Sequence, residues 1–199
     1  MESQTRKPGR PAGRTPTREK LLDAAVTLMR QSGLSGAGIN EIVRKSGAPK
    51  GSVYHFFPEG KDQIVGEALG LHAARVVAFM EEHLSRPRAP GPKLRSLFDA
   101  YAERAEQGRF RVSCPSGAVC LDLDAEMEAL RAQVASTFDA YVDAIARHVE
   151  VGSPRDNRAF AQFVLTAIQG AWIRSRAERS GEPFRQAGAF LAALAAAKQ

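Results

Sequence analysis

The chain has 199 residues, 44% of them hydrophobic, which is enough to bury the core of one large domain or of a small and a medium one. Alanine, leucine and arginine are abundant and runs of β-branched residues are scarce, so the composition favours an all-α fold. No apolar run approaches the ~18 residues of a membrane span, and the basic N-terminus lacks the apolar segment of a signal peptide, so we expect a cytoplasmic protein with no membrane partner.

The net charge of +6 is concentrated in the first third of the chain. Residues 1–63 hold 11 Lys and Arg against 6 Asp and Glu, whereas residues 64–199 hold 17 against 16. A local excess of cations is typical of a surface that binds nucleic acid, with an ordinary solvated charged face as the alternative. Any nucleic-acid contact is therefore expected from the N-terminal third.

Residues 1–16 form a flexible basic arm in this interpretation, because proline and glycine alternate there with cationic side chains. The segment Pro8-Gly9-Arg10-Pro11 is of the extended, narrow kind that can enter an A·T-rich minor groove. A tail that is attracted to phosphates without specificity is the alternative. The cationic residues are Arg6, Lys7, Arg10 and Arg14.

Residues 17–57 are expected to form three helices, one long and two short. The first has Thr17 as its capping residue and ends at Gly33, with apolar side chains at three- and four-residue spacing between them. The second begins at Ile39, and the third is opened by Pro49, since proline is tolerated in a first helical turn. The two short helices have the size of a helix-turn-helix.

A second helical domain is predicted from residue 61 to the C-terminus. Its apolar periodicity is helical throughout, and its breaks coincide with proline and glycine. The chain is thus divided into an arm (1–16), a helix-turn-helix domain (17–60) and a larger domain (61–199). The helices expected in the larger domain are 61–84, Leu94 to about Gly108, 121–151, 155–179 and a last one holding Phe184 to Leu194, with residues 109–120 irregular.

The most specific pattern is Lys50-Gly51-Ser52-Val53-Tyr54-His55-Phe56-Phe57, which lies between two prolines. It combines a lysine, a small hydroxyl and several rings, as expected of a helix that meets DNA with one face and packs with the other. This segment closely resembles the recognition helix of the TetR family of bacterial repressors. The predicted helices at 21–33 and 39–43 match that family's order and spacing, so the resemblance covers about residues 17–65.

Two features depart from the usual family pattern. Pro49 stands where a Ser or Thr cap is usual, and Pro58-Glu59-Gly60-Lys61 holds one residue more than usual before the lysine. Together with the segment Arg111–Leu121, they resemble the LmrA/YxaF-like subgroup, which contains repressors of multidrug-resistance and flavonoid-responsive genes. The resemblance implies an all-helical homodimeric repressor that binds double-stranded operator DNA and is released by a small-molecule effector.

The residues expected to contact DNA lie on the third helix and at the helix ends beside it. Val53, Phe56 and Phe57 are assigned to the core, while core packing remains an alternative for Tyr54. An ordinary surface charge is the alternative for Arg44. The predicted DNA contacts are Arg44, Lys50, Gly51, Ser52, Tyr54, His55 and Lys61.

The larger domain is expected to hold the effector and the dimer interface. The aromatic rings of this domain would suit an apolar or aromatic effector, and its small residues would allow two helices to approach each other in a dimer. For each of these residues the alternative is packing in the core of the single chain. The effector candidates are Phe98, Tyr101, Phe110, Cys114, Phe138, Tyr141, Gln169 and Trp172. The dimer candidates are Phe160, Phe163, Ala167, Gly170, Ala171, Phe190 and Leu194.

Other classes of function find little support in the sequence. We predict neither an enzyme nor a cofactor or metal site, because no phosphate-binding glycine loop, metal-ligand cluster or nucleophile–base arrangement emerges. The two cysteines, Cys114 and Cys120, are expected to be small buried hydrophobes, with a redox sensor at Cys114 as the alternative. A DNA-binding protein without an effector and an activator instead of a repressor also remain open.

Overall fold

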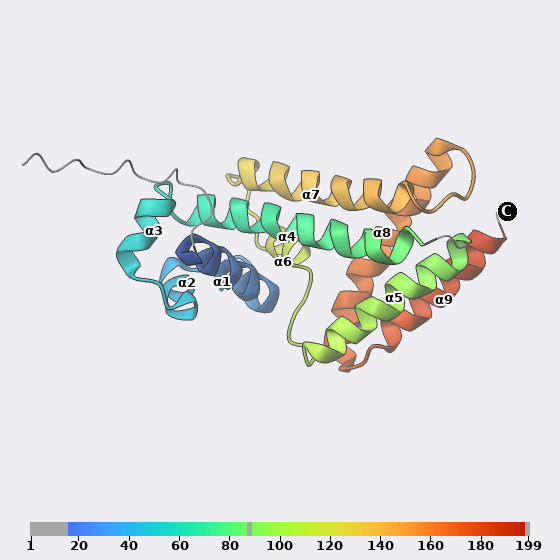
Figure 1. Ribbon diagram of the computed structural model, residues 1–199, viewed down its shortest axis with the longest axis horizontal. Coiled ribbons are helices and arrows are strands. Elements are labelled where there is room, and N and C mark those ends of the chain that lie inside the picture. Colours follow the sequence, from blue (N-terminus) through green and yellow to red (C-terminus); the bar gives the residue numbers. More distant parts are fainter. Residues whose placement is uncertain (1–15, 87–88, 198–199) are drawn as a thin grey trace, which may run out of the picture.

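The computed structural model describes residues 16–86 and 89–197, and within these ranges the regular structure is entirely helical (Figure 1). The predicted all-α fold is confirmed. The predicted arm lies outside the described residues apart from Pro16, which begins α1. The helices are α1 (Pro16–Ser32), α2 (Ile39–Ser46), α3 (Lys50–Phe56), α4 (Lys61–Leu84), α5 (Pro90–Gln107), α6 (Pro115–Leu121), α7 (Glu128–Ala146), α8 (Pro154–Glu178) and α9 (Glu182–Ala196).

Two hydrophobic clusters share the long helix α4, which runs beside α7 through the middle of the molecule (Figure 1). Near its N-terminus, Ile64 and Leu69 pack into a cluster with α1, α2 and α3. Near its C-terminus, Met80 and Leu84 pack into a larger cluster with α5, α7, α8 and α9. One rigid helix thus contributes to both cores, and a shift of α4 would be felt in each of them.

The prediction that residues 109–120 are irregular is wrong, because Pro115–Leu121 forms the helix α6. Proline and glycine were interpreted as helix breakers, but Pro115 occupies the first turn, where its missing N–H costs nothing. Gly117 is accommodated for packing, since a Cβ there would lie only 2.7 Å from Oε1 of Gln169. The glycine thus allows the Gln169 side chain to lie close against α6.

The predicted helix over 121–151 also starts too early. A loop occupies 122–127, and α7 spans only Glu128–Ala146. The next helix, α8, begins within one residue of its predicted start at a capping box, in which the Ser153 hydroxyl and the Asp156 carboxylate satisfy each other's backbone N–H groups. In the described part of the chain no helix is long and apolar enough to cross a membrane.

Candidate nucleic-acid interface and effector cavity

The short helix α3 divides its side chains between core and solvent. Val53 and the following Phe57 are fully buried, and Phe56 is half-buried against the same cluster. On the other side Lys50 and His55 are exposed, and Tyr54 keeps 56% of its surface exposed although it is aromatic. An exposed tyrosine beside cationic and polar groups is suited to bind a phosphate or a base edge.

Glycine at position 51 leaves α3 without a side chain on part of its exposed surface. A Cβ built at Gly51 meets no atom within 4 Å, so the backbone there is open to a close approach by a large partner. Ser52 beside it is half-buried. Arg44 is exposed but forms an ion pair with Glu41 in the same helix, an interaction that lowers the pKa of that carboxyl. Lys61 is half-buried as the first residue of α4, where free N–H groups favour an anion.

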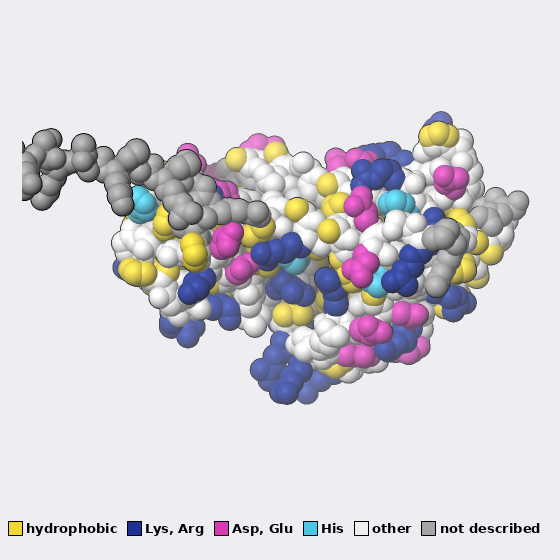
Figure 2. Space-filling model, viewed as in Figure 1, with side chains coloured by type: hydrophobic (Ala, Val, Ile, Leu, Met, Phe, Trp, Pro, Cys, Tyr) yellow, Lys and Arg dark blue, Asp and Glu magenta, His cyan; other side chains and the backbone are white. Residues whose placement is uncertain are grey.

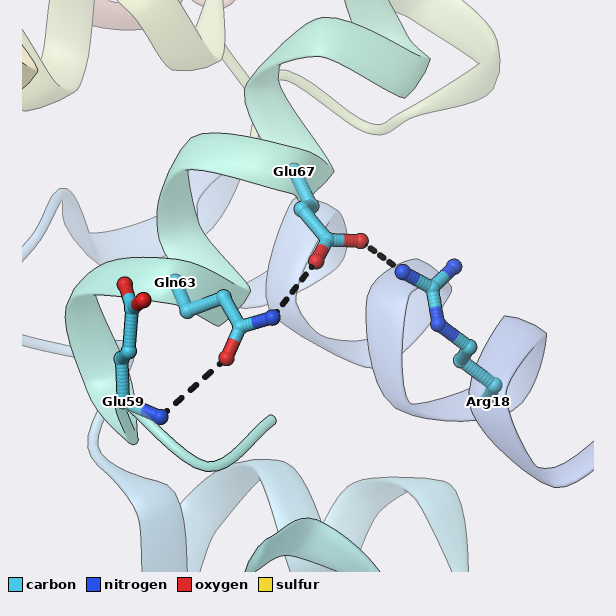
Figure 3. A network of polar contacts seen from close by, with 4 residues as sticks. All are labelled: Arg18, Glu59, Gln63 and Glu67. Atoms are coloured by element: carbon cyan, nitrogen blue, oxygen red, sulfur yellow. Dashed lines mark hydrogen bonds and ion pairs between the residues drawn. The ribbon is translucent and has the colours of Figure 1, made fainter. Parts of the chain in front are cut away.

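A polar network links α1, the loop after α3 and α4 (Figure 3). Glu67 of α4 accepts hydrogen bonds from both Arg18 of α1 and Nε2 of Gln63, the latter over 3.0 Å. Oε1 of Gln63 accepts in turn from the Glu59 N–H at 3.2 Å. The Arg18 guanidinium also lies 5.1 Å from the ring centre of Phe57, which directly follows α3. The network therefore joins α1, the loop after α3 and the first turns of α4.

Five of the eight predicted effector residues line one small cavity within the C-terminal cluster. This aromatic cavity, as we call it, has a volume of about 30 Å³, which leaves room for water but not for an aromatic ring. Phe98, Phe110 and Phe138 do not line it; Phe98 is fully buried in the C-terminal cluster and the other two pack against it. The five predicted residues that line it are Tyr101, Cys114, Tyr141, Gln169 and Trp172.

Two buried hydroxyls at or near this cavity are poorly satisfied within the described part of the chain. The Tyr141 and Ser116 hydroxyls interact only weakly with each other and neither makes a well-formed hydrogen bond, and an unsatisfied buried hydroxyl costs about 1–3 kcal/mol. Burial raises the pKa of Tyr141 and that of the Cys114 thiol, so both groups are protonated at neutral pH. The cavity wall thus offers a donor to a polar group of a ligand.

Among the lining residues that sequence reasoning missed are three with basic or ionisable side chains, Arg30, His72 and Arg104. They connect the aromatic cavity to an open groove of about 450 Å³ between α1, α4 and α5, here called the basic groove. Figure 2 shows basic side chains gathered around a histidine near the middle of the visible face. The spacing of His72 places it on the apolar face of the long helix, but no sequence signal could have grouped it with Arg30 and Arg104, because each of the three lies on a different helix.

The end of α1 is tied to the wall of the aromatic cavity. The Arg30 carbonyl accepts hydrogen bonds from the Ser113 N–H at 2.9 Å and from the Ser113 hydroxyl at 3.0 Å. In return, Nε of Arg30 donates to the Ser113 carbonyl over 3.2 Å. Because Ser113 lines the cavity and Cys114 follows it directly, these three hydrogen bonds link α1 to the cavity wall.

The predicted dimer residues separate into buried and exposed groups. Phe160 and Ala171 lie in the core of the single chain, and Ala167 is half-buried against it. Gly170 is exposed, and Phe163 (56%), Phe190 (79%) and Leu194 retain large exposed surfaces. Ile173, which was not predicted, is 66% exposed on the same helix as Phe163. Among the described residues no group of three His, Cys, Asp or Glu side chains could hold a metal ion.

Comparison with known proteins identifies both halves of the chain. The family model described as bacterial regulatory proteins, tetR family, matches residues 21–68. The model described as the C-terminal domain of LmrA/YxaF-like transcriptional regulators matches residues 90–190. The predicted resemblance is confirmed for the family and for the subgroup.

Individual relatives agree with these matches over nearly the full length. An uncharacterized HTH-type transcriptional regulator of Mycobacterium tuberculosis, Rv0196, is 31% identical over 83% of this chain and 87% of its own. The crystal structure of a TetR regulatory protein from Rhodobacter sphaeroides superimposes with a TM-score of 0.80 at 20% identity, covering 89% of this chain and 98% of that one. The regulator CifR, solved with 26-bp operator DNA, gives 0.75 at 17% identity over 92% and 98%.

Proposed function

Since this chain belongs to the TetR family of DNA-binding transcriptional regulators and carries an LmrA/YxaF-like C-terminal domain, we propose that it is a dimeric repressor released from its operator by a small effector. The family and the matched relatives are regulators and not enzymes. The observation that carries the proposal is the exposed face of α3. There Lys50, Tyr54 and His55 stand free of the core while Val53 anchors the helix behind them.

The short helix suits a major groove. At ~1.5 Å per residue, the seven residues of α3 span about 10 Å, which fits a groove about 12 Å wide. Lys50 and Lys61 would bind phosphates, whereas Ser52 and His55 would reach base edges. Gly51 lets the backbone come close to the DNA. One such helix reads few base pairs, so specificity requires a second copy and a palindromic site.

A dimer face is available on α8 and α9, which pack against each other. Phe163 and Ile173 form a stripe along α8 that passes the open position Gly170, and Phe190 and Leu194 are one turn apart on α9. Exposed rings of this size in one place indicate an interaction surface. A second copy, related by a twofold axis, would bury these side chains, because the same patch of each protomer would face the other.

The effector would act through the wall of the aromatic cavity. Filling the cavity displaces the segment at Cys114, and the hydrogen bonds of Ser113 pass that movement to Arg30 of α1. The shared helix α4 offers a parallel route. To weaken operator binding 100-fold, an effector needs only about 2.7 kcal/mol of coupling between the two sites.

Selection of genomic DNA fragments by the purified full-length protein tests this function. Fragments are recovered with and without a library of small aromatic compounds, and Tyr54→Ala provides the DNA-binding control. We expect a palindromic motif in the recovered fragments and its loss when an effector is present. If the wild-type protein recovers random fragments, it does not bind a specific operator. If no compound changes the recovered fragments, the result supports a DNA-binding regulator without an effector.

A further inference from the structure

Two arginines face the basic groove without an acidic partner. Arg30 of α1 and Arg104 of α5 line both the groove and the aromatic cavity. The one acidic residue of the groove lining, Asp23, pairs with Arg75 at 2.7 Å. Within residues 16–86 and 89–197, no carboxylate forms an ion pair with Arg30 or Arg104. Two positive charges therefore remain uncompensated where the groove meets the cavity.

These two guanidinium groups are held in position. Burial lowers the pKa of Arg30, and the positive charge of Arg104 lowers it further, yet a guanidinium stays protonated at neutral pH. Its Nε is engaged by the Ser113 carbonyl, which leaves both Nη groups for another acceptor. The Arg104 guanidinium lies over the Phe79 ring, 3.5 Å from its centre. Both residues line the same groove and the charge of Arg104 is felt at Arg30, so an anion that binds both would reduce the repulsion between them.

The histidine beside them adds a hydrogen-bonding group without adding charge. Burial lowers the pKa of His72 to about 4, with smaller effects from the positive charges of Arg30, Arg75 and Arg104. Its imidazole is therefore neutral at physiological pH and can donate or accept one hydrogen bond at each ring nitrogen. The third arginine of the groove lining, Arg75, is paired with Asp23, so His72 adds no cation to the charges of Arg30 and Arg104.

The other side of the arginine pair is aromatic. Tyr101 lies 6.0 Å from Trp172 in an edge-on arrangement, and both line the cavity directly behind the arginines. Tyr141 lines the same wall with its poorly satisfied hydroxyl. A ligand that satisfies every group must combine a negative charge at one end with a flat apolar body at the other.

We propose that the effector is an aromatic organic anion whose acidic group binds between Arg30 and Arg104. This inference rests on the proposed function, because it names the chemical class of that effector. The ring of the ligand faces Tyr101 and Trp172, and a polar substituent on it pairs with the Tyr141 hydroxyl. Carboxylate is the acidic group best matched to paired guanidinium forks.

Such a ligand would connect the two domains directly. Arg30 belongs to α1, which packs with the helix-turn-helix, and Arg104 belongs to α5 in the C-terminal domain. Because the aromatic cavity encloses only about 30 Å³, a ring that enters it must push its wall outward. The anion holds Arg30 while the wall carrying Ser113 moves, so the three hydrogen bonds between these two residues are the contacts at risk.

Matched pairs of aromatic acids and amides test the charge requirement. Benzoate, cinnamate and 2-naphthoate are compared with their uncharged carboxamides by calorimetry on the full-length protein and by release of labelled operator. We expect at least one acid to bind about tenfold or more tighter than its amide, and Arg104→Gln to remove most of that preference. Arg158→Gln is the control: it removes a charge that lies outside the basic groove and the aromatic cavity, so the variant should still prefer the acid to the amide.

The possible outcomes separate this inference from the function on which it rests. If acid and amide bind equally well, or if only neutral aromatic compounds release the operator, the proposal of an anionic effector is wrong. The proposed function as a ligand-responsive repressor would still stand. If none of the acids binds to a protein that still binds its operator, the proposal of an anionic effector is also wrong. Arg30→Gln is the second variant. If it loses operator binding through its contact with Ser113, Arg104→Gln still decides the question.

Discussion

The carboxylate of Asp122, at the end of α6, accepts a hydrogen bond from the Ser35 N–H, which lies 2.9 Å from Oδ2. The same oxygen would be 2.5 Å from a Cβ at Gly33, whose φ of +67° independently favours glycine. Cys114 caps the other end of α6 and lines the aromatic cavity. The short helix that sequence reasoning overlooked thus lies between the cavity and the loop that leads into the helix-turn-helix.

Replacing Asp122 by alanine should loosen this loop. The Ser35 N–H would lose its partner, so we expect the free energy of unfolding to fall by about 1 kcal/mol. Hydrogen–deuterium exchange should quicken in the loop of residues 33–38. Asp124→Ala, in the neighbouring loop, is the matched control and should leave the exchange of 33–38 as it is. Equal exchange in wild type and Asp122→Ala would show that this contact does not stabilise the loop.

Lys61→Ala should weaken binding to all DNA sequences alike, because a lysine at a helix N-terminus contacts phosphate and not base. The slope of log affinity against log salt concentration should decrease by roughly 1. Arg147→Ala, which removes a charge from the far end of α7, should leave the slope unchanged. An unaltered slope in Lys61→Ala would exclude this lysine as a DNA contact.

Substitution of Ser52 or His55 should change the operator sequence that is preferred. His55 is exposed on α3 and Ser52 is half-buried beside Gly51, and a base contact contributes about 1–3 kcal/mol of discrimination. Selection from randomised half-sites with Ser52→Ala and His55→Ala measures this directly. If both variants recover the wild-type motif, the sequence is read by other residues or through the shape of the DNA.

Phe190→Glu should convert the proposed dimer into monomers. The introduced carboxylate would be buried without a partner at the centre of the proposed interface, which is expected to cost several kcal/mol. Light scattering coupled to size-exclusion chromatography gives the mass, and operator affinity should fall with it. Leu121→Glu is the control, since Leu121 is equally exposed but lies on α6. A Phe190→Glu protein of dimer mass would contradict the proposed face.

His72 should make the fold less stable as the solution becomes acidic. Its folded pKa of about 4 lies below the usual 6.5, so between these values the unfolded chain binds a proton that the folded chain does not. The contribution of His72 to the free energy of unfolding is thus constant above pH 6.5, and it lowers that free energy by up to about 3 kcal/mol as the pH falls toward 4. Urea unfolding of His72→Asn should show a shallower decline than wild type and than His148→Asn.

Local sequence determined much of the helical organisation. Thr17 was expected to cap the first helix, yet α1 already begins at Pro16, because a cap is a weak signal beside the apolar face that follows. The long helix at 61–84 was predicted with its exact bounds, since its apolar spacing and the flanking glycine and serine agree. Pro115 and Gly117 misled the prediction of α6, because composition cannot show that a neighbouring Gln169 occupies the space of a Cβ.

By itself the sequence determined the family, the helix-turn-helix and the face of α3 that remains in solvent, because these depend on contacts within about fifty consecutive residues. Only the tertiary structure decided which rings share a cavity and which fill the core. It alone brought Arg30 and Arg104 to one groove and joined Arg30 to Ser113, 83 positions away. The physical reason is that charge compensation and enclosed space are properties of neighbours in three dimensions, and neither leaves a periodic trace along the chain.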